Sequence, residues 1–460
     1  MDQNLEKAPA ARSSFTGKIG FVLAAAGSAV GLGNIWRFPY LAAKYGGGIF
    51  LLTYILLSLT FGFSLMIAEI AIGRKTGKSP ISAFKSLDKR FAFLGYLAAA
   101  VPALILPYYS VIGGWVMKYS FGFLTGSGSD MAQDGYFGGF ISSTGEPLFW
   151  FFLFVALTAV IVMLGVKKGV ELVSKFMMPV LIALMIFIVI YTIATTDGAG
   201  AGVAYYLLPN FENFSIMTVV AAMGQLFYSM SLAMGIMITY GSYMKKDISI
   251  EKSVHQIEIF DTGIAILAGL LIVPACFAFS GGDATKIGAG PGLMFETLPQ
   301  IFDNMTGGGV IGFVFFITVF LAALTSSISL METVVSTIMD KFKLERKLCC
   351  LIVIGICLVL GTPSALGFSL WKMIEPLPDM SILDFFDFIS NSIMMPILAL
   401  ITCIFVGYIL KPRAVIEEIE ASGKFTLKKM FVVMIRYVAP VFLVAVLVSS
   451  ILNGFKIYEI

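Results

Sequence analysis

Long apolar runs recur along the whole chain, and they constrain its fold more than any other feature. Crossing about 30 Å of hydrocarbon takes roughly 20 apolar residues in a helix. The composition allows many such runs, because 58% of the 460 residues are hydrophobic and only 13% are charged. The runs lack the alternation of barrel strands, so the sequence predicts an all-α polytopic membrane protein. The eleven expected spans cover residues 18–44, 48–73, 93–123, 148–164, 170–195, 214–243, 257–281, 309–341, 348–361, 381–409 and 431–455.

The distribution of positive charge predicts the orientation of the chain in its membrane. Most of the 31 Lys and Arg residues fall in alternate loops, and the loops between them carry almost none. By the positive-inside rule, the basic loops and the N-terminal segment 1–17 are cytoplasmic. An odd number of spans then places the C-terminus on the extracytoplasmic side. Because these charges lie beside membrane spans and form no basic domain, we expect no nucleic-acid binding.

The sequence contains no recognisable catalytic constellation. The five cysteines lie in or beside apolar runs without CxxC spacing, and the single histidine, His255, cannot form a metal site alone. HExxH and GxSxG motifs are also missing from the sequence, so we expect no enzyme activity. Two alternatives to a carrier of this architecture stay open. One is a channel, which requires a continuous pore that is usually built by an oligomer, and the other is an ion-coupled carrier from a different family.

The first and sixth spans contain segments that suit a membrane helix poorly. Residues 27–34 read GSAVGLGN and precede Arg37, and residues 224–235 read GQLFYSMSLAMG. Glycine permits backbone conformations that other residues avoid, and an interrupted helix is tolerated in a bilayer only where its free backbone groups are satisfied. We expect both spans to be unwound at mid-membrane. Close helix packing through Gly27 and Gly31 is the alternative for the first segment.

The two interrupted spans divide the chain into similar halves. Each opens a group of five spans, in residues 18–195 and 214–409, and residues 431–455 form one additional span. Interrupted helices at corresponding positions of two halves are typical of inverted-repeat transporters, in which the binding site lies between the breaks. We therefore expect a site between the first and sixth spans.

Residues 27–40, which read GSAVGLGNIWRFPY, resemble the first-helix signature of the neurotransmitter:sodium symporters. The resemblance continues through residues 108–109, 224–243, 322–330 and the last span. It implies a LeuT-like fold, a 5+5 inverted repeat with one additional helix. It also implies sodium-coupled symport of a neutral amino acid, in a prokaryotic inner membrane, by a protein that transports as a monomer.

The resemblance implies two sodium sites built from oxygen ligands, which hard cations prefer. The first is expected to use the substrate carboxylate with Ala29, Asn34, Ser229 and Asp261. The second is expected to use Gly27, Val30, Ala322, Thr325 and Ser326. For the last two residues, hydroxyl bonds to the preceding helical turn are the alternative.

Asp261 is the clearest departure from the chloride-dependent animal relatives, which the resemblance aligns with a neutral asparagine there. A buried carboxylate requires a partner charge, and a sodium ion would supply it. We therefore expect transport without chloride. The alternative is an acid that faces the cytoplasmic vestibule.

The resemblance also implies a substrate pocket. The substrate carboxylate would meet freed amides near Gly33, the Tyr109 hydroxyl and sodium, and its amine would meet carbonyls and Ser231. Monoamine carriers of the family have an aspartate where this chain has Gly31. An amine without its own carboxylate would lack that counter-charge here, so the substrate is expected to be an α-amino acid. The expected side-chain pocket is lined by Ile105, Tyr228, Met234, Ser326 and Leu330, which favours apolar or aromatic amino acids. Ala29 and Ser229, which belong to the first sodium site, are expected to contact the substrate as well.

Charged pairs at two depths are expected to act as gates, because charges in or beside a membrane tend to be paired. Arg37 with Asp384 would close the outer face above Tyr109 and Tyr228, and Arg12 with Asp340 would close the inner face. For Arg12 and Asp340, solvated surface charge is the alternative. The family's Gly-X9-Pro pattern at Gly169 and Pro179 implies that the fifth span can unwind, and a static proline kink is the alternative.

Overall fold

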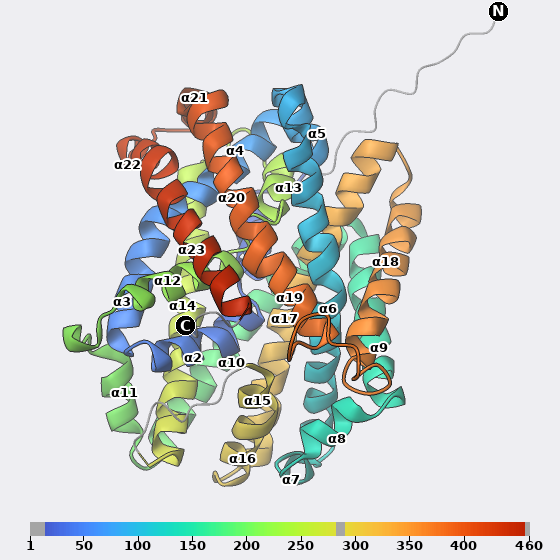
Figure 1. Cartoon of the computed structure of the whole chain (residues 1–460), viewed down its shortest axis with the longest axis vertical. Coiled ribbons are helices and arrows are strands. Elements are labelled where there is room, and N and C mark those ends of the chain that lie inside the picture. Colours follow the sequence, from blue (N-terminus) through green and yellow to red (C-terminus); the bar gives the residue numbers. More distant parts are fainter. Residues whose placement is uncertain (1–13, 282–289, 456–460) are drawn as a thin grey trace, which may run out of the picture.

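The computed structural model describes residues 14–281 and 290–455, and within them the chain forms a bundle of helices (Figure 1). In these ranges the β pairing consists of one isolated bridge, between Gly47 and Pro209. The predicted all-α class is therefore confirmed. Arg12 lies outside the described residues, so the expected Arg12–Asp340 pair stays a prediction.

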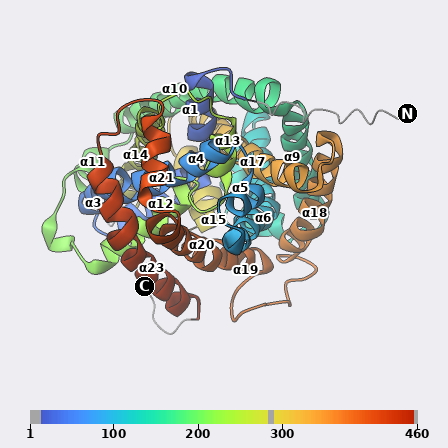
Figure 2. The ribbon, with the colours of Figure 1, turned by 90° about the horizontal axis from the view of Figure 1, so that it is seen from above.

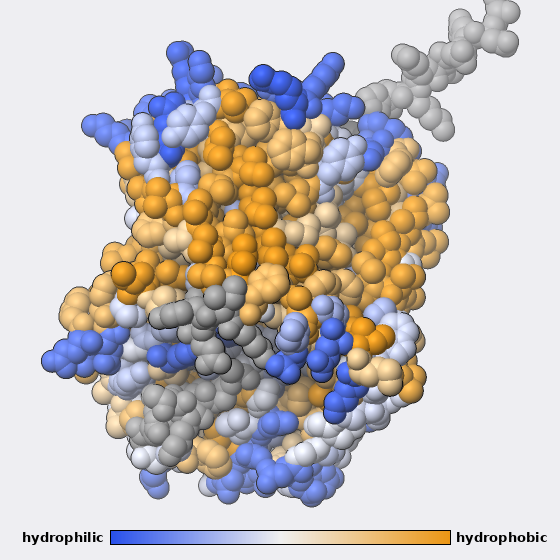
Figure 3. All heavy atoms as spheres, viewed as in Figure 1, coloured by the Kyte–Doolittle hydropathy of each residue, from blue (hydrophilic) through white to orange (hydrophobic). Residues whose placement is uncertain are grey.

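Nine helical segments of the described chain are long and apolar enough to cross a membrane. They cover Gly48–Thr76, Lys89–Leu124, Gly145–Met163, Val166–Thr195, Ile250–Phe279, Gly308–Phe342, Arg346–Leu366, Ile382–Ile409 and Lys428–Gly454. Their main helices are α3 (Gly48–Leu57), α4 (Phe63–Thr76), α6 (Ala92–Leu124), α9 (Gly145–Met163), α10 (Leu172–Thr195), α14 (Ile250–Phe279), α17 (Gly308–Phe342), α18 (Arg346–Leu366), α20 (Met395–Ile404) and α23 (Ala439–Gly454). On the face shown in Figure 3, a hydrophobic band lies between two hydrophilic ends, as expected of a multi-pass membrane protein.

The first span is broken, as the sequence predicts. Helix α1 (Lys18–Ala29) ends at an extended Val30, and the chain resumes as the π-helical turn η1 (Gly33–Arg37) followed by α2 (Phe38–Lys44). The two parts meet at an angle of 55°. The amide of Val30 still bonds to Ala26, but the amides of Gly31 and Leu32 bond to side chains instead of to the helix.

The sixth span is broken as well. Helix α12 (Ile216–Ser229) and helix α13 (Ile236–Tyr243) are separated by residues 230–235. Ser231, Ala233 and Gly235 have φ angles of 52°, 53° and 68°, in the left-handed region that an α-helix cannot contain. Each piece is too short to cross a bilayer, and together they form the predicted sixth span.

The fifth span contains a local distortion next to its predicted hinge. The π-helical turn η4 (Val166–Glu171) surrounds Gly169, where a Cβ would lie 2.0 Å from the carbonyl oxygen of Ile161. Pro179 lies inside α10, which continues past it. Only glycine fits at position 169, because the backbone there lies so close to Ile161. Opening of the span during transport stays a prediction.

Short helices outside the spans were not anticipated from the sequence. They are α5 (Pro80–Leu87), α7 (Gly128–Met131), α8 (Tyr136–Ser142), α11 (Ala199–Leu207), α15 (Gly290–Gly292), α16 (Leu298–Asp303) and α21 (Pro412–Glu420). Two further short helices, α19 (Ile382–Asp387) and α22 (Lys428–Val433), begin the last two spans. Helices α5, α13, α21 and α22 lie at the upper end of the bundle in Figure 1, which we call the basic end because basic loops gather there. Helices α7, α8 and α16 lie at the opposite end.

The broken spans lie inside the bundle. Helix α1 packs against α10, α14 and α17, and α13 packs against α4 and α17. Seen from above, α12, α13 and α17 lie near the middle, whereas α3, α11, α18 and α23 lie at the rim (Figure 2). The freed backbone groups are therefore shielded from lipid, as a break within a bilayer requires.

We expect Gly73→Ala to lower the thermal unfolding temperature of the purified protein. A methyl group at this position of α4 would lie 1.9 Å from the carbonyl oxygen of Ile238 in α13, and overpacking of this kind costs about 1–3 kcal/mol. The matched control is Gly355→Ala in α18, where a methyl meets nothing within 4 Å. Equal unfolding temperatures for the two variants would contradict the close contact of α4 and α13.

Candidate functional site

A narrow cavity lies between the two helix breaks. Its lining comes from both breaks and from α6 and α17, and it comprises Ser28, Ala29, Gly31, Leu32, Gly33, Ile105, Tyr109, Tyr228, Ser231, Met234, Ile236, Ser326 and Leu330. Every pocket residue expected from the sequence is in this lining except Ser229. Ser229 ends α12 and lies against Asp261 instead.

The wall of the cavity carries both apolar side chains and polar groups. Ile105, Met234 and Leu330 are buried apolar side chains. Among the polar groups, the amide of Leu32 donates to the Tyr109 hydroxyl at 3.4 Å, and the Ser231 hydroxyl donates to the carbonyl of Ser28 at 2.9 Å. A pocket of this kind suits a ligand with a polar head and an apolar side chain.

Gly31 and Gly33 keep this cavity open. A Cβ on Gly31 would lie 2.7 Å from the Ser326 hydroxyl, and one on Gly33 would lie 2.3 Å from the Tyr228 ring. A side chain at either position would fill the space between the breaks. The absence of a side chain at these two glycines therefore leaves room for the cavity, in addition to permitting the break in the first span.

Asp261 is the centre of a buried polar cluster beside this cavity. It lies in α14 with no exposed surface, and Asn34 donates to one of its carboxylate oxygens at 2.7 Å. The hydroxyls of Tyr54 and Ser229 lie 3.1 and 3.3 Å from the other oxygen. Within residues 14–281 and 290–455, no Lys or Arg forms an ion pair with Asp261. Three hydrogen bonds compensate this carboxylate only in part, because removing a charge from water costs several kcal/mol.

Asn34 joins this cluster to the first break. Its side-chain oxygen accepts from the amide of Gly31 at 3.0 Å, while its side-chain nitrogen donates to Asp261. Asn34, Ser229 and Asp261 are therefore gathered where η1, α12 and α14 meet, and Ala29 ends α1 five residues before Asn34. Asp261 is fully buried at the centre of this cluster.

The hydroxyls of Ser326 and Thr325, which are adjacent in α17, bond to different parts of the structure. The Ser326 hydroxyl reaches the broken span and lies 3.1 Å from the carbonyl oxygens of Ser28 and Val30 and 3.5 Å from that of Gly27. The Thr325 hydroxyl donates to Ala322 in its own helix at 3.0 Å, which is the alternative that the sequence left open. A Cβ on Gly27 would nevertheless lie 3.3 Å from Thr325. The residues expected to form the second sodium site are thus neighbours.

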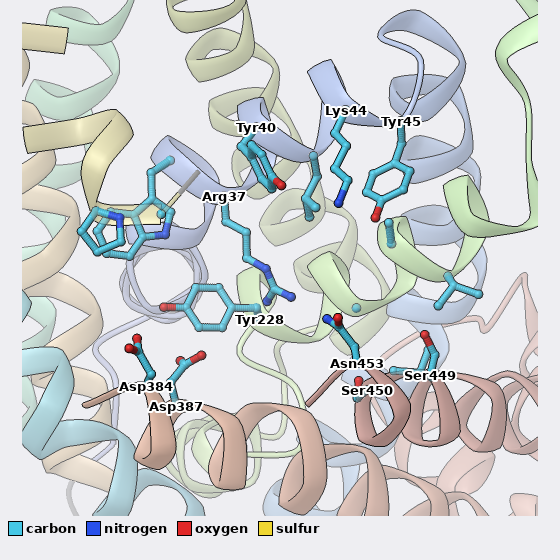
Figure 4. A pocket seen from close by; sticks show the side chains of 18 of the residues that line it. Arg37, Tyr40, Lys44, Tyr45, Tyr228, Asp384, Asp387, Ser449, Ser450 and Asn453 are labelled. Carbon is cyan, nitrogen blue, oxygen red and sulfur yellow. The ribbon is translucent and has the colours of Figure 1, made fainter. Parts of the chain in front are cut away.

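A wider vestibule leads toward the cavity (Figure 4), and the helices α2, α15 and α19 that contribute to its lining lie away from the basic end in Figure 1. Tyr228 lines both spaces, and the Arg37 guanidinium lies 5.4 Å from the centre of its ring. Arg37 and Asp384 line the same vestibule, but no ion pair joins them in the described structure. Asp384 instead accepts from the Ser381 hydroxyl at 2.7 Å. Figure 4 shows the Tyr228 ring between Arg37 and the two aspartates, Asp384 and Asp387.

The basic end is closed in the same structure. Phe15 is fully buried, and its amide donates to the carbonyl of Tyr243 at the end of α13 at 3.1 Å. Asp340 accepts from the amide of Ser79 at 2.8 Å, which ties α17 to the start of α5. Vestibule and closure therefore lie at opposite ends of the bundle.

Three buried residues that support the site were not identified from the sequence. Gln225 donates to the freed carbonyl of Gly33 at 2.8 Å, and Glu69 accepts from the freed amide of Ala233 at 2.8 Å. Tyr54 shares a hydrogen bond of 2.7 Å with Ser229. The sequence could have pointed to Glu69, because an acidic residue within an apolar span is expected to be functional or paired. Nothing in the sequence distinguishes Tyr54 from an ordinary core tyrosine.

Comparison with known proteins places this geometry in one family. The family model for the sodium:neurotransmitter symporter family matches residues 12–129 and 138–458. A sodium-dependent transporter of Haemophilus influenzae is 32% identical over 459 residues, which covers 96% of this chain and 98% of that protein. The sodium-dependent transporter YhdH of Bacillus subtilis is 33% identical over 442 residues, with 94% and 96% covered.

A solved structure shares the fold. The crystal structure of MhsT in complex with L-phenylalanine matches with a TM-score of 0.86 at 36% identity, over 95% of this chain and 100% of that chain. This match confirms the LeuT-like fold, and the family is one of transporters, not of enzymes. A family match over most of the chain, two sodium-dependent relatives and this shared fold agree with one another. The chain therefore belongs to the sodium:neurotransmitter symporter family.

Proposed function

We propose that this protein imports a neutral apolar or aromatic amino acid across the cell membrane together with sodium, by alternating access and without chloride. The observation that carries the proposal is the narrow cavity between two broken spans, beside an acid, Asp261, that has no cationic partner among the described residues. The phenylalanine bound to MhsT supports a ligand of this class. The basic end is the cytoplasmic end in this proposal.

The substrate would span the cavity between its polar groups and its apolar side chains. Its carboxylate would meet the amides near Gly33 and the Tyr109 hydroxyl, and its amine would meet Ser231 and the carbonyls freed by the sixth-span break. Ile105, Met234 and Leu330 would contact the side chain. Methionine adapts its shape easily, so we expect a range of large apolar side chains to be accepted.

Two sodium ions would bind beside the substrate. The first would be held by Asn34, Ser229, Asp261, the carbonyl of Ala29 and the substrate carboxylate. The second would lie among Ser326, Thr325 and the carbonyls of Gly27, Val30 and Ala322. Hard cations prefer such oxygen ligands, and binding of the second ion would require the Thr325 hydroxyl to turn from its own helix.

Two ions supply enough free energy for concentrative uptake. A tenfold sodium gradient is worth about 1.4 kcal/mol per ion, and a potential of 100 mV adds roughly 2.3 kcal/mol per charge. Two ions that cross with a zwitterion therefore supply about 7 kcal/mol, which corresponds to roughly 10⁵-fold accumulation. One ion would support only about 500-fold accumulation.

The arrangement of open and closed ends fits an outward-facing state in this orientation. The vestibule would admit substrate past Arg37 and Tyr228, and contact between Arg37 and Asp384 would then close it. Opening of the basic end would require release of Phe15 from Tyr243 and loosening of the fifth span near Gly169. Unwinding there, with Pro179 following, would open a water path to the second sodium site.

Transport itself is tested in sealed vesicles that contain the purified protein. We expect uptake of labelled L-phenylalanine when sodium is outside and none when choline replaces it, because sodium gradients would drive the cycle. A competition series with the other amino acids would rank the side chains that the pocket accepts. Uptake that is equally fast in choline would reject sodium coupling.

The role of Tyr54 is tested by Tyr54→Phe, which removes one hydroxyl from the Asp261 cluster. We expect the sodium concentration for half-maximal phenylalanine binding to rise roughly tenfold, since a hydrogen bond to a charged group contributes about 1.5–3 kcal/mol. Tyr206→Phe is the control, because this buried hydroxyl donates to the carbonyl of Ile266 at 3.2 Å and, among the described residues, not to Asp261. The same rise in both variants would show a general effect on packing.

Chloride independence is tested by exchanging chloride for gluconate. We expect unchanged phenylalanine uptake, because the carboxylate of Asp261 would balance the sodium charge. Asp261→Asn should weaken sodium binding by at least about tenfold, equivalent to 1.4 kcal/mol, whereas Asp197→Asn in an exposed loop should not. A strict chloride requirement in the unmodified protein would overturn the role given to Asp261.

A further inference from the structure

A second, unexplained cavity lies at the basic end, far along the chain from the substrate site. It opens between α21 and the start of the last span, which consists of α22 and the π-helical turn η10 (Met434–Val438). Four basic side chains line it, namely Lys411, Arg413, Lys428 and Arg436. Two acids, Glu417 and Glu420, also line it, so the cavity carries excess positive charge.

Glu417 and Glu420 each form an ion pair with one of the four basic side chains. Arg413 pairs with Glu417 along α21 at 2.8 Å, and Lys428 pairs with Glu420 across the cavity at 2.7 Å. In the part of the chain that the structure describes, Lys411 and Arg436 form no ion pair. Two cations therefore face one cavity without a counter-charge from the protein.

Arg436 is held in place, but its charge is not neutralised. Its Nε donates to the carbonyl of Gly407 at 2.9 Å, and its guanidinium carbon lies 5.9 Å from the centre of the Tyr408 ring. The Tyr408 hydroxyl in turn donates to the carbonyl of Arg436 at 2.8 Å. The terminal guanidinium nitrogens have no partner among the described residues, so they are free to bind an anion. A planar guanidinium suits the oxygen atoms of a phosphate.

The neighbours of Arg436 face the surroundings of the bundle and are largely apolar. Val433 and Tyr437 in the last span are 49% and 59% exposed, and Tyr408 and Ile409 in the preceding span are 51% and 39% exposed. Exposed aliphatic and tyrosine side chains near the end of a span mark the boundary of the hydrocarbon. In Figure 3, hydrophilic residues at this upper end border the hydrophobic band directly. A ligand here would have its charge in the cavity and an apolar part beside the spans.

We propose that this cavity binds the phosphate headgroup of an anionic phospholipid, with Arg436 and Lys411 as its principal contacts. Basic pockets at the cytoplasmic side of membrane helices suit such headgroups. The lipid would brace α21 against the last span. A free phosphate compound shares the anionic chemistry, but it would make no use of the exposed apolar side chains around Arg436. The proposal depends on the membrane position of the protein and not on its transported substrate.

Native mass spectrometry of the full-length protein in detergent tests this assignment. Purified protein is mixed with phosphatidylglycerol or with phosphatidylcholine that has the same acyl chains. We expect tighter retention of phosphatidylglycerol, reduced roughly fivefold by Arg436→Gln and by Lys411→Gln. Lys411→Gln keeps the test valid if Arg436→Gln folds poorly, because no described side-chain contact depends on Lys411. The control is Arg90→Gln, which removes an exposed arginine that pairs with Asp88.

The outcomes separate the possible ligands. Retention of phosphatidylglycerol that falls in both cavity variants and not in Arg90→Gln supports the proposal. Equal retention of the two lipids, or an equal loss in Arg90→Gln, would overturn it as a general charge effect. Displacement of bound phosphatidylglycerol by millimolar glycerol phosphate or inorganic phosphate would also overturn it, because the site would then recognise a soluble anion. Transport of phenylalanine in vesicles of phosphatidylcholine alone is measured separately, so failure of this proposal leaves the transport proposal intact.

Discussion

Backbone groups within hydrocarbon must find partners inside the protein, and this structure is organised around two places where helices stop providing them. Residues 30–32 and 230–235 leave their helices in the middle of the bundle. Each unpaired peptide group in lipid would cost several kcal/mol, so such breaks persist only because other spans surround them. Helices α6, α14 and α17 enclose the first break, and α4 and α17 lie beside the second.

Buried polar side chains satisfy part of what the breaks release. Gln225 binds the carbonyl of Gly33, Glu69 binds the amide of Ala233, and Ser326 contacts the carbonyls of Ser28 and Val30. These contacts come from the second, sixth and eighth spans, so the breaks connect the two halves of the chain. The carbonyls of the breaks also supply the kind of ligand that sodium prefers. One physical constraint thus explains both the stability of the centre and its proposed chemistry.

Asp261 illustrates how strongly such a centre depends on charge. Asn34, Tyr54 and Ser229 surround the carboxylate, yet no basic side chain of the described chain reaches it. A carboxylate buried without a cation is expensive, and a bound sodium ion would remove most of that cost. Sodium affinity and substrate affinity would then depend on each other, because in the proposed site the substrate carboxylate would complete the same coordination shell. Such mutual dependence is a coupling free energy between two ligands.

The sequence by itself determined the membrane class, the approximate spans and the two breaks. Apolar length and glycine-rich interruptions are local properties, and they retain their meaning whatever surrounds them. The residues expected to line the pocket came from the resemblance, and all of them except Ser229 line one cavity. The short helices outside the spans were missed, because polar loops carry no apolar periodicity from which a helix is predicted.

Only the tertiary structure decided which partners meet. Tyr54 and Gln225 look like ordinary core residues in the sequence. The role of Tyr54 appears only when the second span packs against the seventh, and that of Gln225 only when the sixth span packs against the broken first span. Arg37 and Asp384 share a vestibule without contact, since the separation of two charges depends on the conformation that the bundle adopts. Sequence fixes which side chains are available, whereas distances between spans follow from packing across residues that lie hundreds of positions apart.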